Sequence, residues 1–431
     1  MALTGRTALL AALGALVVGV VLPGWWGLVA VQGVLAAGVL ADLALAAGVR
    51  GLHLTRSGDT AVRLGGEATV HLVVHNPGPR PLRGVLRDAW PPSAGADPTR
   101  HDLHVPAGER RRLTVTLRPT RRGDRRAARV TVRSVGPLGL AARQGAHEVP
   151  WSVRALPPFT SRRHLPARLA RLRELDGRTA AMVRGQGTEF DSLRAYVAGD
   201  DVRSIDWRAS ARAPEVVVRT WRPERDRHLL LVLDTGRTSA GRVGDAPKLD
   251  VAMDAALLLG ALASRAGDRV DLLAYDRAVR AGVVGAGRRE LLPALVEAMA
   301  AVEPELTETD VPGLVSTVLG RARQRSLVVL FTGLDAAAVE EGLLPGLAAL
   351  TGRHRVLVAA VADPRVAEMA AGRGDSTAVY GAAAAEQARA ERRAVARLLD
   401  RRGVTVVDAA PDDLAPRVAD AYLALKAAGR L

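Results

Sequence analysis

The sequence predicts a multidomain protein with an N-terminal transmembrane helical hairpin, a β-sandwich and then a doubly wound α/β domain. No charged residue occurs between Thr7 and Ala41. Short stretches of alternating apolar and polar residues follow as far as residue 155, and continuous apolar strands then alternate with helical segments. We place the domains at 1–49, 50–155, 156–227 and 228–431, the third being a linker helix and a charged segment.

The apolar N-terminal stretch predicts two membrane-spanning helices, at about 7–22 and about 26–48. Pro23-Gly24 separates them, and the two tryptophans that follow suit a membrane interface. At 1.5 Å per residue the spans reach roughly 24 Å and 34 Å, against a hydrocarbon core of about 30 Å. A cleaved signal peptide is the alternative, but the apolar stretch continues too long for one.

The basic residues around these spans predict their orientation. Arg6 precedes the first span, Arg50 and Arg56 follow the second, and the turn between the spans is uncharged. By the positive-inside rule both termini are cytoplasmic, which makes the chain a two-pass protein of the cell membrane in contact with the lipid bilayer. Asp42 would lie near the inner end of the second span, where it can reach headgroups or a partner.

The composition excludes several kinds of chemistry. Cysteine is absent, so disulfides, thiol nucleophiles and thiolate metal sites are excluded. The net charge of +15 favours contact with anionic surfaces, namely phospholipid headgroups, nucleic acid or an acidic protein. Aromatic residues make up only 3% of the chain, which argues against base stacking, and we expect no nucleic-acid partner. Phosphate-loop, dinucleotide, zinc-protease and nucleophile-elbow motifs do not occur, so we predict no small-molecule substrate.

The predicted β-sandwich rests on apolar residues that recur with a period of two. Three such stretches, at 70–74, 113–117 and 130–132, are separated by turns rich in Gly, Pro and Asn. Short alternating strands of this kind are typical of an immunoglobulin- or fibronectin-like fold with one core.

A basic amphipathic segment follows Pro157-Pro158. Its leucines, at helical spacing, lie among arginines and predict a helix: Leu165, Leu169, Leu172 and Leu175. This helix would either lie on an anionic membrane surface or pack on its own domain as a linker, with its arginines in solvent.

The last part of the chain predicts a parallel sheet covered by helices on both faces. We expect strands at 229–233, 270–275, 327–331, 356–361 and 404–407, with a possible hairpin partner at 279–284. Helices are expected around 248–264, 289–302, 311–323, 336–350 and 382–402, and at the end of the chain. Ligands of such folds bind at the carboxyl ends of the strands.

The segment 187–212 carries the most specific pattern, G-x-E-F-x-x-L-R-x-Y-x-x-G-D-x-x-R-x-I-D-W-x-x-S-A-R. Its residues with a candidate signature or docking role are Glu189, Arg194, Tyr196, Asp200, Asp201, Arg203, Asp206, Trp207 and Arg212. The segment could be a structural clamp that docks onto the sheet, with its carboxylates paired to arginines and its aromatic rings as packing anchors. It could also present a recognition surface, or form a carboxylate catalytic site. Acids beside several arginines make poor general acids, so we assign no catalytic residue.

This pattern resembles the signature of the bacterial "domain of unknown function 58" family. Pro119-x-x-Arg122-Gly123 and Pro137-Leu138-Gly139-Leu140 resemble the N-terminal half of the same family. The resemblance implies a non-enzymatic, membrane-anchored cytoplasmic scaffold or adaptor. It also implies a MoxR-type AAA+ ATPase as partner, in protein complex assembly or an envelope-related process.

Within that resemblance, Asp234-Thr235-Gly236-Arg237-Thr238 is similar to the Asp-x-Ser-x-Ser start of a von Willebrand factor A domain, whose adhesion site holds Mg²⁺. Asp234 and Thr238 fit the motif. Three other positions complete the comparison: Gly236 in place of the first serine, Gly333 where the second aspartate is expected with Asp335 two residues later, and Thr307 or Thr309 as the loop threonine. Two ligands are too few for Mg²⁺, so the resemblance implies a degenerate metal site and no cofactor.

Two other functions stay open. A metal-dependent adhesion or binding protein would need its soluble part exported. A hydrolase that uses the Asp/Arg signature would lose activity on Asp200→Ala or Asp206→Ala while it stays folded, whereas a structural clamp predicts a lower thermal midpoint.

Overall fold

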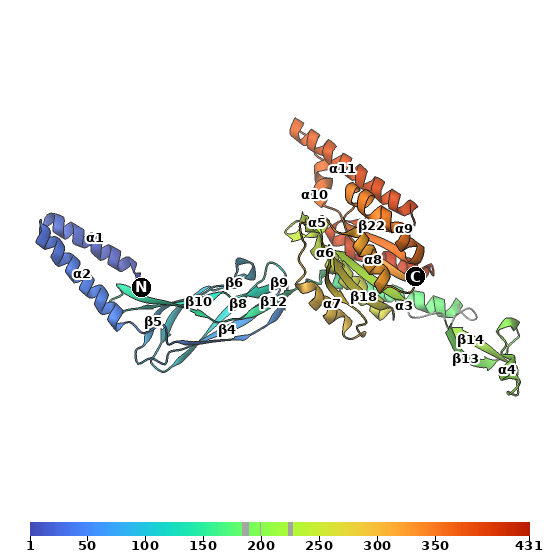
Figure 1. The fold of residues 1–431 in the computed structure, drawn as a ribbon, viewed down its shortest axis with the longest axis horizontal. Coiled ribbons are helices and arrows are strands. Elements are labelled where there is room, and N and C mark those ends of the chain that lie inside the picture. The colour runs from blue at the N-terminus through green and yellow to red at the C-terminus, as the bar shows by residue number, and fades with distance from the viewer. Residues whose placement is uncertain (183–188, 199, 223–226) are drawn as a thin grey trace. The chain divides into compact units, whose positions relative to one another are not determined.

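The computed structural model describes residues 1–182, 189–198, 200–222 and 227–431 (Figure 1). The chain divides into two compact units, Met1–Leu156 and Pro157–Leu431. The first contains two apolar helices and a β-rich part, and the second contains a mostly parallel sheet with its helices.

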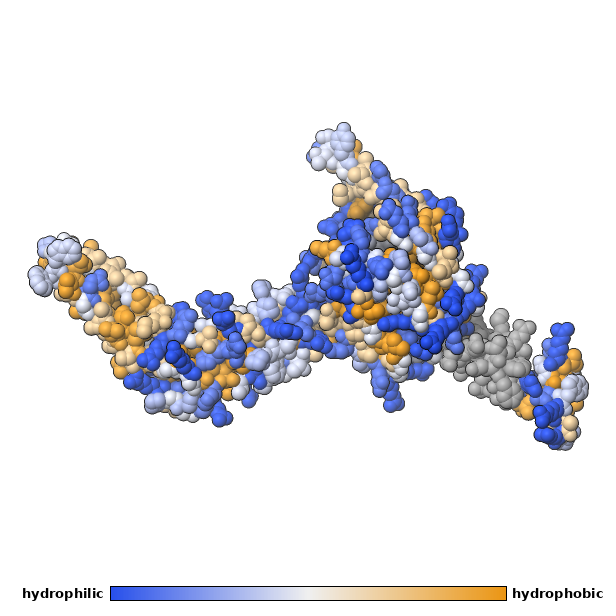
Figure 2. Space-filling view, viewed as in Figure 1, coloured by the Kyte–Doolittle hydropathy of each residue, from blue (hydrophilic) through white to orange (hydrophobic). Residues whose placement is uncertain are grey.

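The two apolar helices, α1 (Gly5–Val20) and α2 (Trp25–Leu45), pack side by side, and Gly14 allows the closest approach by meeting Val31. Figure 2 shows hydrophobic residues along their outer surface. In the described part of the chain, α2 alone is long and apolar enough to cross a membrane. Only 6% of its most apolar stretch of 18 residues is buried. The helix ends at Leu45, three residues before the predicted end, because Ala47 and Val49 already belong to the core of the β-rich part.

The β-rich part consists of three sheets with the strand orders β1-β11-β10-β5-β7, β2-β4-β8-β6 and β3-β12-β9. Neighbouring strands are antiparallel, apart from the parallel pair β3 and β12. The strands are β1 Ala2–Leu3, β2 His53–Gly58, β3 Ala61–Arg63, β4 Ala68–His75, β5 Leu82–Asp88, β6 Ala96–Asp97, β7 Arg100–Val105, β8 Arg110–Leu117, β9 Gly123–Arg126, β10 Arg129–Val135, β11 Ala141–Glu148 and β12 Ser152–Leu156.

The two larger sheets of this part enclose one core. Leu72 of β4 and Leu113 of β8, in one sheet, share an apolar cluster with Leu86 of β5 and Val132 of β10, in the other. Buried and partly exposed residues alternate strictly along β4, as its sequence predicts. The alternation at 70–74, 113–117 and 130–132 therefore corresponds to β4, β8 and β10.

The second unit contains a six-stranded sheet with the order β19-β18-β15-β20-β21-β22, in which only the edge strand β19 is antiparallel to its neighbour. Its strands are β15 His228–Asp234, β18 Arg269–Tyr275, β19 Val279–Val283, β20 Ser326–Phe331, β21 Arg355–Val361 and β22 Thr405–Ala409. Its main helices are α6 Lys248–Arg265, α7 Leu291–Ala300, α8 Val311–Arg321, α9 Leu344–Arg353, α10 Pro364–Ala370, α11 Ser376–Arg401 and α12 Pro411–Ala427.

Helices cover both faces of this sheet, which explains why its strands are continuously apolar. Leu230 and Val232 of β15 pack in one cluster with residues of α8, α9 and α11. Leu231 points to the opposite face, where Gly260 of α6 lies close to its side chain. The connection from β15 runs through α6 to β18 on one side, whereas β20 lies on the other side of β15. The strand order therefore reverses between β15 and β20, which is where ligands of such sheets bind.

Helix α3 (Leu165–Met182) is the predicted basic linker helix. Leu172 is buried, and Arg168 donates to Asp420 of α12 at 2.9 Å. Just before α3, Asp254 of α6 accepts hydrogen bonds from Thr160 and Ser161. The helix is thus packed on its own unit, which favours the linker interpretation over a membrane-surface helix.

Candidate functional site

The predicted ligand site lies at the carboxyl end of β15, where Asp234 is buried within a cluster of hydroxyl groups. One carboxylate oxygen accepts from the Gly236 N–H at 2.9 Å and the Thr309 hydroxyl at 2.6 Å. The other accepts from Thr238 at 2.8 Å and Thr332 at 2.5 Å. Both oxygens of Asp234 are therefore satisfied within the protein.

The structure brings together most of the residues that the sequence nominates here. Thr238 lies beside Asp234 as predicted, and the loop threonine is Thr309. Thr307 contributes instead its backbone carbonyl, which accepts from the Arg237 N–H. Sequence reasoning missed Thr332, although its place directly after β20 at the same edge of the sheet was a usable signal.

Gly236 and Gly333 supply no ligand, and neither position has room for a side chain that could supply one. A Cβ atom on Gly236 would collide with the Thr309 hydroxyl and would meet the Thr307 carbonyl at 2.9 Å. A Cβ atom on Gly333 would fall 2.5 Å from Oδ2 of Asp335, which occupies the space where the expected second aspartate would begin.

These residues do not fit a Mg²⁺ ion, which needs a near-octahedral set of oxygens that usually includes a carboxylate free to bind it. The Asp234 carboxylate is fully hydrogen-bonded, the hydroxyls around it carry no charge, and Asp335 is exposed. Among the described residues, no group of three or more His, Cys, Asp or Glu is placed to hold a metal.

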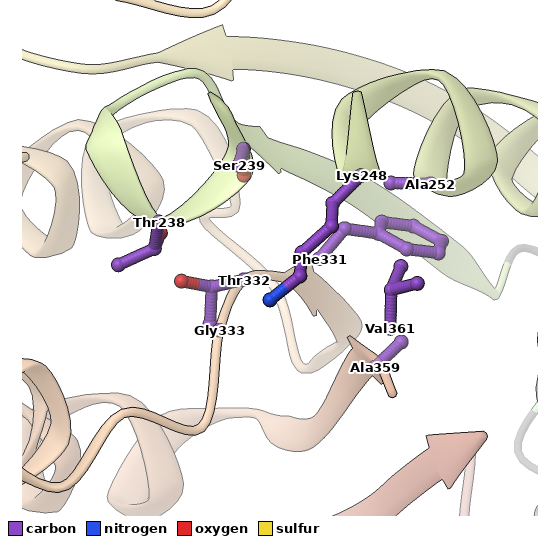
Figure 3. Close-up of a pocket in the computed structure, with 9 residues that line it drawn as sticks. All are labelled: Thr238, Ser239, Lys248, Ala252, Phe331, Thr332, Gly333, Ala359 and Val361. Atoms are coloured by element: carbon purple, nitrogen blue, oxygen red, sulfur yellow. The ribbon is translucent and has the colours of Figure 1, made fainter. Parts of the chain in front are cut away.

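Beside this cluster, next to the reversal of strand order, an open pocket lies between the ends of β20 and β21 and the start of α6 (Figure 3). Its volume is about 240 Å³, including the solvent at its mouth. The pocket, called the edge pocket below, is lined by Thr238, Ser239, Lys248, Ala252, Phe331, Thr332, Gly333, Ala359 and Val361. The ammonium group of Lys248 points toward the Thr332 side chain.

The charged segment forms a two-stranded antiparallel sheet, β13 (Glu189–Ala195) with β14 (Val217–Arg222), and two short helical turns lie between the strands. We call residues 189–198 and 200–222 the charged hairpin. Arg194 donates two hydrogen bonds to Asp200, at 2.6 and 2.7 Å, which lower the pKa of this carboxyl. The N–H groups of the short helix Trp207–Ser210, chiefly that of Ala209, and then Arg219 lower the pKa of Asp206.

The described residues show the local bonds of the charged hairpin, and its docking onto the sheet as a clamp, with Tyr196 and Trp207 as anchors, stays a prediction. Trp207 is 70% exposed and Tyr196 is 37% exposed. The ion pairs of Asp200 and Asp206 lie within the hairpin, since their partners are Arg194 and Arg219. A two-stranded sheet has no second layer to cover its rings, so local bonds to the carboxylates shape the segment instead.

The remaining signature residues do not form the expected network. Asp201 accepts from the Arg203 N–H and so caps its own turn. Within the part of the chain that the structure describes, Arg203 and Arg212 make no ion pair. The backbone of Glu189 pairs with Arg222, but the Glu189 side chain lies outside the described part, as do Gly187, Thr188 and Gly199.

The expectation that Asp42 reaches headgroups or a partner is wrong. This carboxylate is fully buried and accepts backbone N–H bonds from Leu138 at 2.7 Å, Ala141 at 3.0 Å and Leu140. Gly136 makes this possible, because a Cβ atom there would overlap the carboxylate. The Pro137–Leu140 turn therefore receives the end of α2.

Arginines also hold this junction, although Arg56 is not one of them. Arg143 donates to the Leu43 carbonyl at 2.8 Å and Arg80 donates to the Ala44 carbonyl, which are exposed acceptors at the end of α2. Arg56, predicted as a charge flanking the membrane, is buried and paired with Asp88 in the β-rich part.

Residues 192–402 match the family described as "Protein of unknown function DUF58". The matched stretch runs from β13 to the last turn of α11 and contains both the charged hairpin from Ser192 onward and the edge pocket.

Three curated relatives, uncharacterized proteins of Mycobacterium bovis and of two strains of Mycobacterium tuberculosis, are each 27% identical over 197 residues. The similarity covers 45% of this chain and spans 61% of the length of each relative.

The similarity to solved structures is weak. The CARDB domain of the PF1109 protein from Pyrococcus furiosus is 15% identical, with 24% of this chain and 86% of that chain covered and a TM-score of 0.18. Proximal thread matrix protein 1 from the mussel byssus is 11% identical, with 47% of each chain covered and a TM-score of 0.26. These values are too low to carry an argument about function.

Proposed function

We propose that this chain is a non-enzymatic, membrane-anchored cytoplasmic scaffold or adaptor that works with a MoxR-type AAA+ ATPase in protein complex assembly or an envelope-related process. The observation that carries the proposal is the exposed apolar surface of α2, whose end is built into a folded, β-rich part. In this proposal the first unit is an immunoglobulin- or fibronectin-like sandwich. The second is a von Willebrand factor A-like domain without its metal.

We propose that α1 and α2 cross the bilayer as a hairpin, with both ends of the hairpin in the cytoplasm. Arg80 and Arg143 meet the last carbonyls of α2, and Arg6 lies at the start of α1 against the turn at Gly139. Positive charge therefore gathers where the helices meet the β-rich part, and none lies at the turn between the helices. This distribution supports a cytoplasmic first unit.

We also propose that the charged hairpin binds the partner. Its exposed apolar side chains are Leu193, Tyr196, Val197, Val202, Trp207 and Val216. A soluble protein rarely leaves so many large apolar side chains uncovered on one small element, unless another molecule covers them. The ion pairs of Asp200 and Asp206 hold the hairpin in shape before binding, which lowers the entropic cost of association.

The proposal of a non-catalytic role is supported by the chemistry of the acids. The Asp234 carboxylate is saturated by four hydrogen bonds, and the lowered pKa values of Asp200 and Asp206 suit permanent anions rather than general acids.

The proposed function is tested by affinity capture of the full-length chain from membranes under conditions that trap the ATPase with bound nucleotide. The wild-type chain should recover an AAA+ ATPase, and Trp207→Ala should recover much less of it. Tyr380→Ala is the matched control, because Tyr380 is an aromatic residue of similar exposure on α11. Failure of the wild-type chain to recover any AAA+ ATPase would contradict the proposal.

The topology is tested separately with a reporter fused after Leu431. A reporter that is active only in the cytoplasm is the expected result. Activity only outside the cytoplasm would instead support an exported adhesion or binding protein.

A further inference from the structure

We propose that the end of the β-rich part next to α2 binds anionic phospholipids, with arginine side chains on the lipid phosphate groups. This inference rests on the proposed crossing of the bilayer by α1 and α2, and it names the class of lipid that the anchor selects. It does not depend on the side of the membrane on which the first unit lies.

Four segments of the β-rich part meet at the end of α2. The chain that follows the helix covers residues 46–53, and the turn before β11 holds the carboxylate of Asp42. The loop before β5 reaches the helix through Arg80, which donates to a carbonyl of its last turn. Asn76 joins this loop to the turn before β8, since its N–H donates to the Glu109 carbonyl at 3.0 Å.

The charged side chains of these segments are almost all positive. Residues 46–53, 76–83, 104–111 and 136–143 contain six arginines and no lysine, against a single acidic residue, Glu109. All six arginines are exposed, and we call them the arginine collar: Arg50, Arg80, Arg83, Arg110, Arg111 and Arg143. In the part of the chain that the structure describes, none of the six pairs with a carboxylate.

The opposite end of the β-rich part has exposed arginines too, but carboxylates lie among them. Arg118 pairs with Glu67 at 2.8 Å, and Arg154 pairs with Asp124 at 2.7 Å. The first unit as a whole contains 20 arginines and nine acidic residues, so it holds +11 of the net charge of +15. Six like charges without partners repel one another, so anions from another molecule would stabilise the collar.

One class of molecule matches both the collar and the helices beside it. The outer surface of α1 and α2 is apolar, and hydrophilic residues gather where these helices meet the β-rich part (Figure 2). A phospholipid beside α2 offers acyl chains to the helix and a phosphate group at the level of the collar. A nucleic acid or an acidic protein matches the charge but not the adjoining apolar surface.

The collar lies within reach of the headgroup layer. Arg80 and Arg143 bond to the last turn of α2, and Arg83, Arg110 and Arg111 occupy the first two positions of β5 and β8. At about 3.3 Å per residue, these positions lie within roughly 7 Å of the strand ends, and a headgroup layer is about 5–7 Å thick. A guanidinium keeps its charge there and can hold a phosphate through two parallel hydrogen bonds.

The first experiment measures lipid selectivity. The full-length chain is reconstituted in phosphatidylcholine vesicles with a trace of spin-labelled phosphatidylglycerol or spin-labelled phosphatidylcholine, and electron spin resonance reports the share of each label held by the protein. Phosphatidylglycerol should be held at least about twofold more strongly. The preference should vanish near 1 M salt, where the Debye length is about 3 Å. Equal binding of the two labels would overturn the proposal.

The second experiment locates the selectivity with two variants that lose the same charge. The test variant spares Arg80 and Arg143, which hold the end of α2, and replaces three other collar arginines: Arg83→Gln, Arg110→Gln and Arg111→Gln. The control variant replaces three exposed arginines at the opposite end of the β-rich part: Arg121→Gln, Arg126→Gln and Arg129→Gln. The preference for phosphatidylglycerol should fall to near one in the test variant and stay at the wild-type value in the control. An equal fall in both would overturn the collar.

The outcomes separate this inference from the proposed function. A wild-type chain that enters the vesicles but shows no preference removes the collar and leaves the membrane anchor standing. A wild-type chain that stays out of the vesicles removes the anchor and the collar together. Binding of a short DNA duplex that the test variant loses, without a preference for phosphatidylglycerol, would assign the collar to nucleic acid and would also overturn the proposal.

Discussion

A single carboxylate, that of Asp42, fastens the end of helix α2 to the turn between β10 and β11. The sequence places this aspartate near the end of an apolar stretch, which is compatible with a headgroup contact as well as with a buried anchor. Only the folded turn decides between these, because its three N–H groups converge from residues almost 100 positions away. Contacts of such long range leave no periodic signal in a sequence.

Replacement of Asp42 by asparagine should destabilise the first unit. The amide keeps one acceptor oxygen and points an NH₂ group at backbone donors, so we expect a loss of about 2–4 kcal/mol in the free energy of unfolding. Thermal unfolding of the full-length chain in detergent measures the effect. Asp102→Asn is the control, since Asp102 is exposed in the same unit. Equal midpoints for the two variants would mean that the anchor contributes little.

Asp254 gives a prediction with a defined dependence on pH. Burial raises the pKa of this carboxyl, although hydrogen bonds from Ser161 and Thr160 act in the opposite direction. The folded carboxyl therefore binds a proton more readily than the unfolded chain does. The second unit should gain stability as the pH falls through the raised pKa toward the ordinary value of about 3.9.

The matched variant for this prediction is Asp254→Asn, which cannot titrate. The thermal midpoint of the wild type minus that of the variant should increase as the pH is lowered from neutral to mildly acidic values. A difference that stays constant or decreases over this range would refute the assignment.

At the scale of elements, the charged hairpin was recognised from its sequence pattern, but its packing was not. Interleaved charges and rings suggest burial, because buried charges need partners. The structure places the partners along the hairpin itself and leaves Trp207 exposed. A sequence shows which charges are present, but whether they pair across a domain or along a strand depends on the tertiary arrangement.

The hairpin predicts a local rather than a global effect for Asp206→Ala. This change removes the cap of a short helix and the ion pair with Arg219. Trypsin should cleave faster after Arg203, Arg208 and Arg212, while the thermal midpoint of the second unit stays near that of the wild type. Tryptic mapping and calorimetry of both proteins measure these outcomes. A marked fall in the midpoint would instead support the clamp interpretation.

At the scale of the whole molecule, the strands and most helices of the second unit follow from the sequence, because strands buried on both faces read as continuous apolar runs. Helix α10 and the first six residues of α11 were not predicted, since α10 has only seven residues and the chain between the two helices is rich in Gly and polar residues. The edge pocket could be placed on the correct side of the sheet from strand order alone. That Lys248 lines the pocket could not be predicted, because the path of the chain from β15 to α6 is not readable from the sequence.

The two compact units predict separable folding. A chain that contains only Pro157–Leu431 should be soluble and should keep one cooperative thermal transition, since its core clusters lie entirely within the unit. A chain that begins after Leu45 should have an unstable first unit, because β1, the Asp42 anchor and the end of α2 are removed with the helices. Calorimetry of both truncated chains tests this pair of outcomes, and equal stability of the two would contradict it.

The geometry around Asp234 predicts no specific binding of Mg²⁺. Titration calorimetry of the full-length chain at millimolar Mg²⁺ should show no saturable heat, and the metal should leave the thermal midpoint unchanged. A saturable signal that is lost in Asp335→Asn would show that this exposed carboxylate completes a site after all.

The anchored end of α2 has a mechanical consequence. A membrane helix joined to a domain by loose chain acts as a tether, and the domain can turn freely beneath it. Here the last turn of the helix is fixed by a carboxylate and two arginines to the turn after β10, to β11 and to the loop between β4 and β5. If α2 spans a bilayer and an ATPase pulls on the chain, both as proposed, the first unit can rotate only when the helix tilts with it, so the bilayer would resist the load directly.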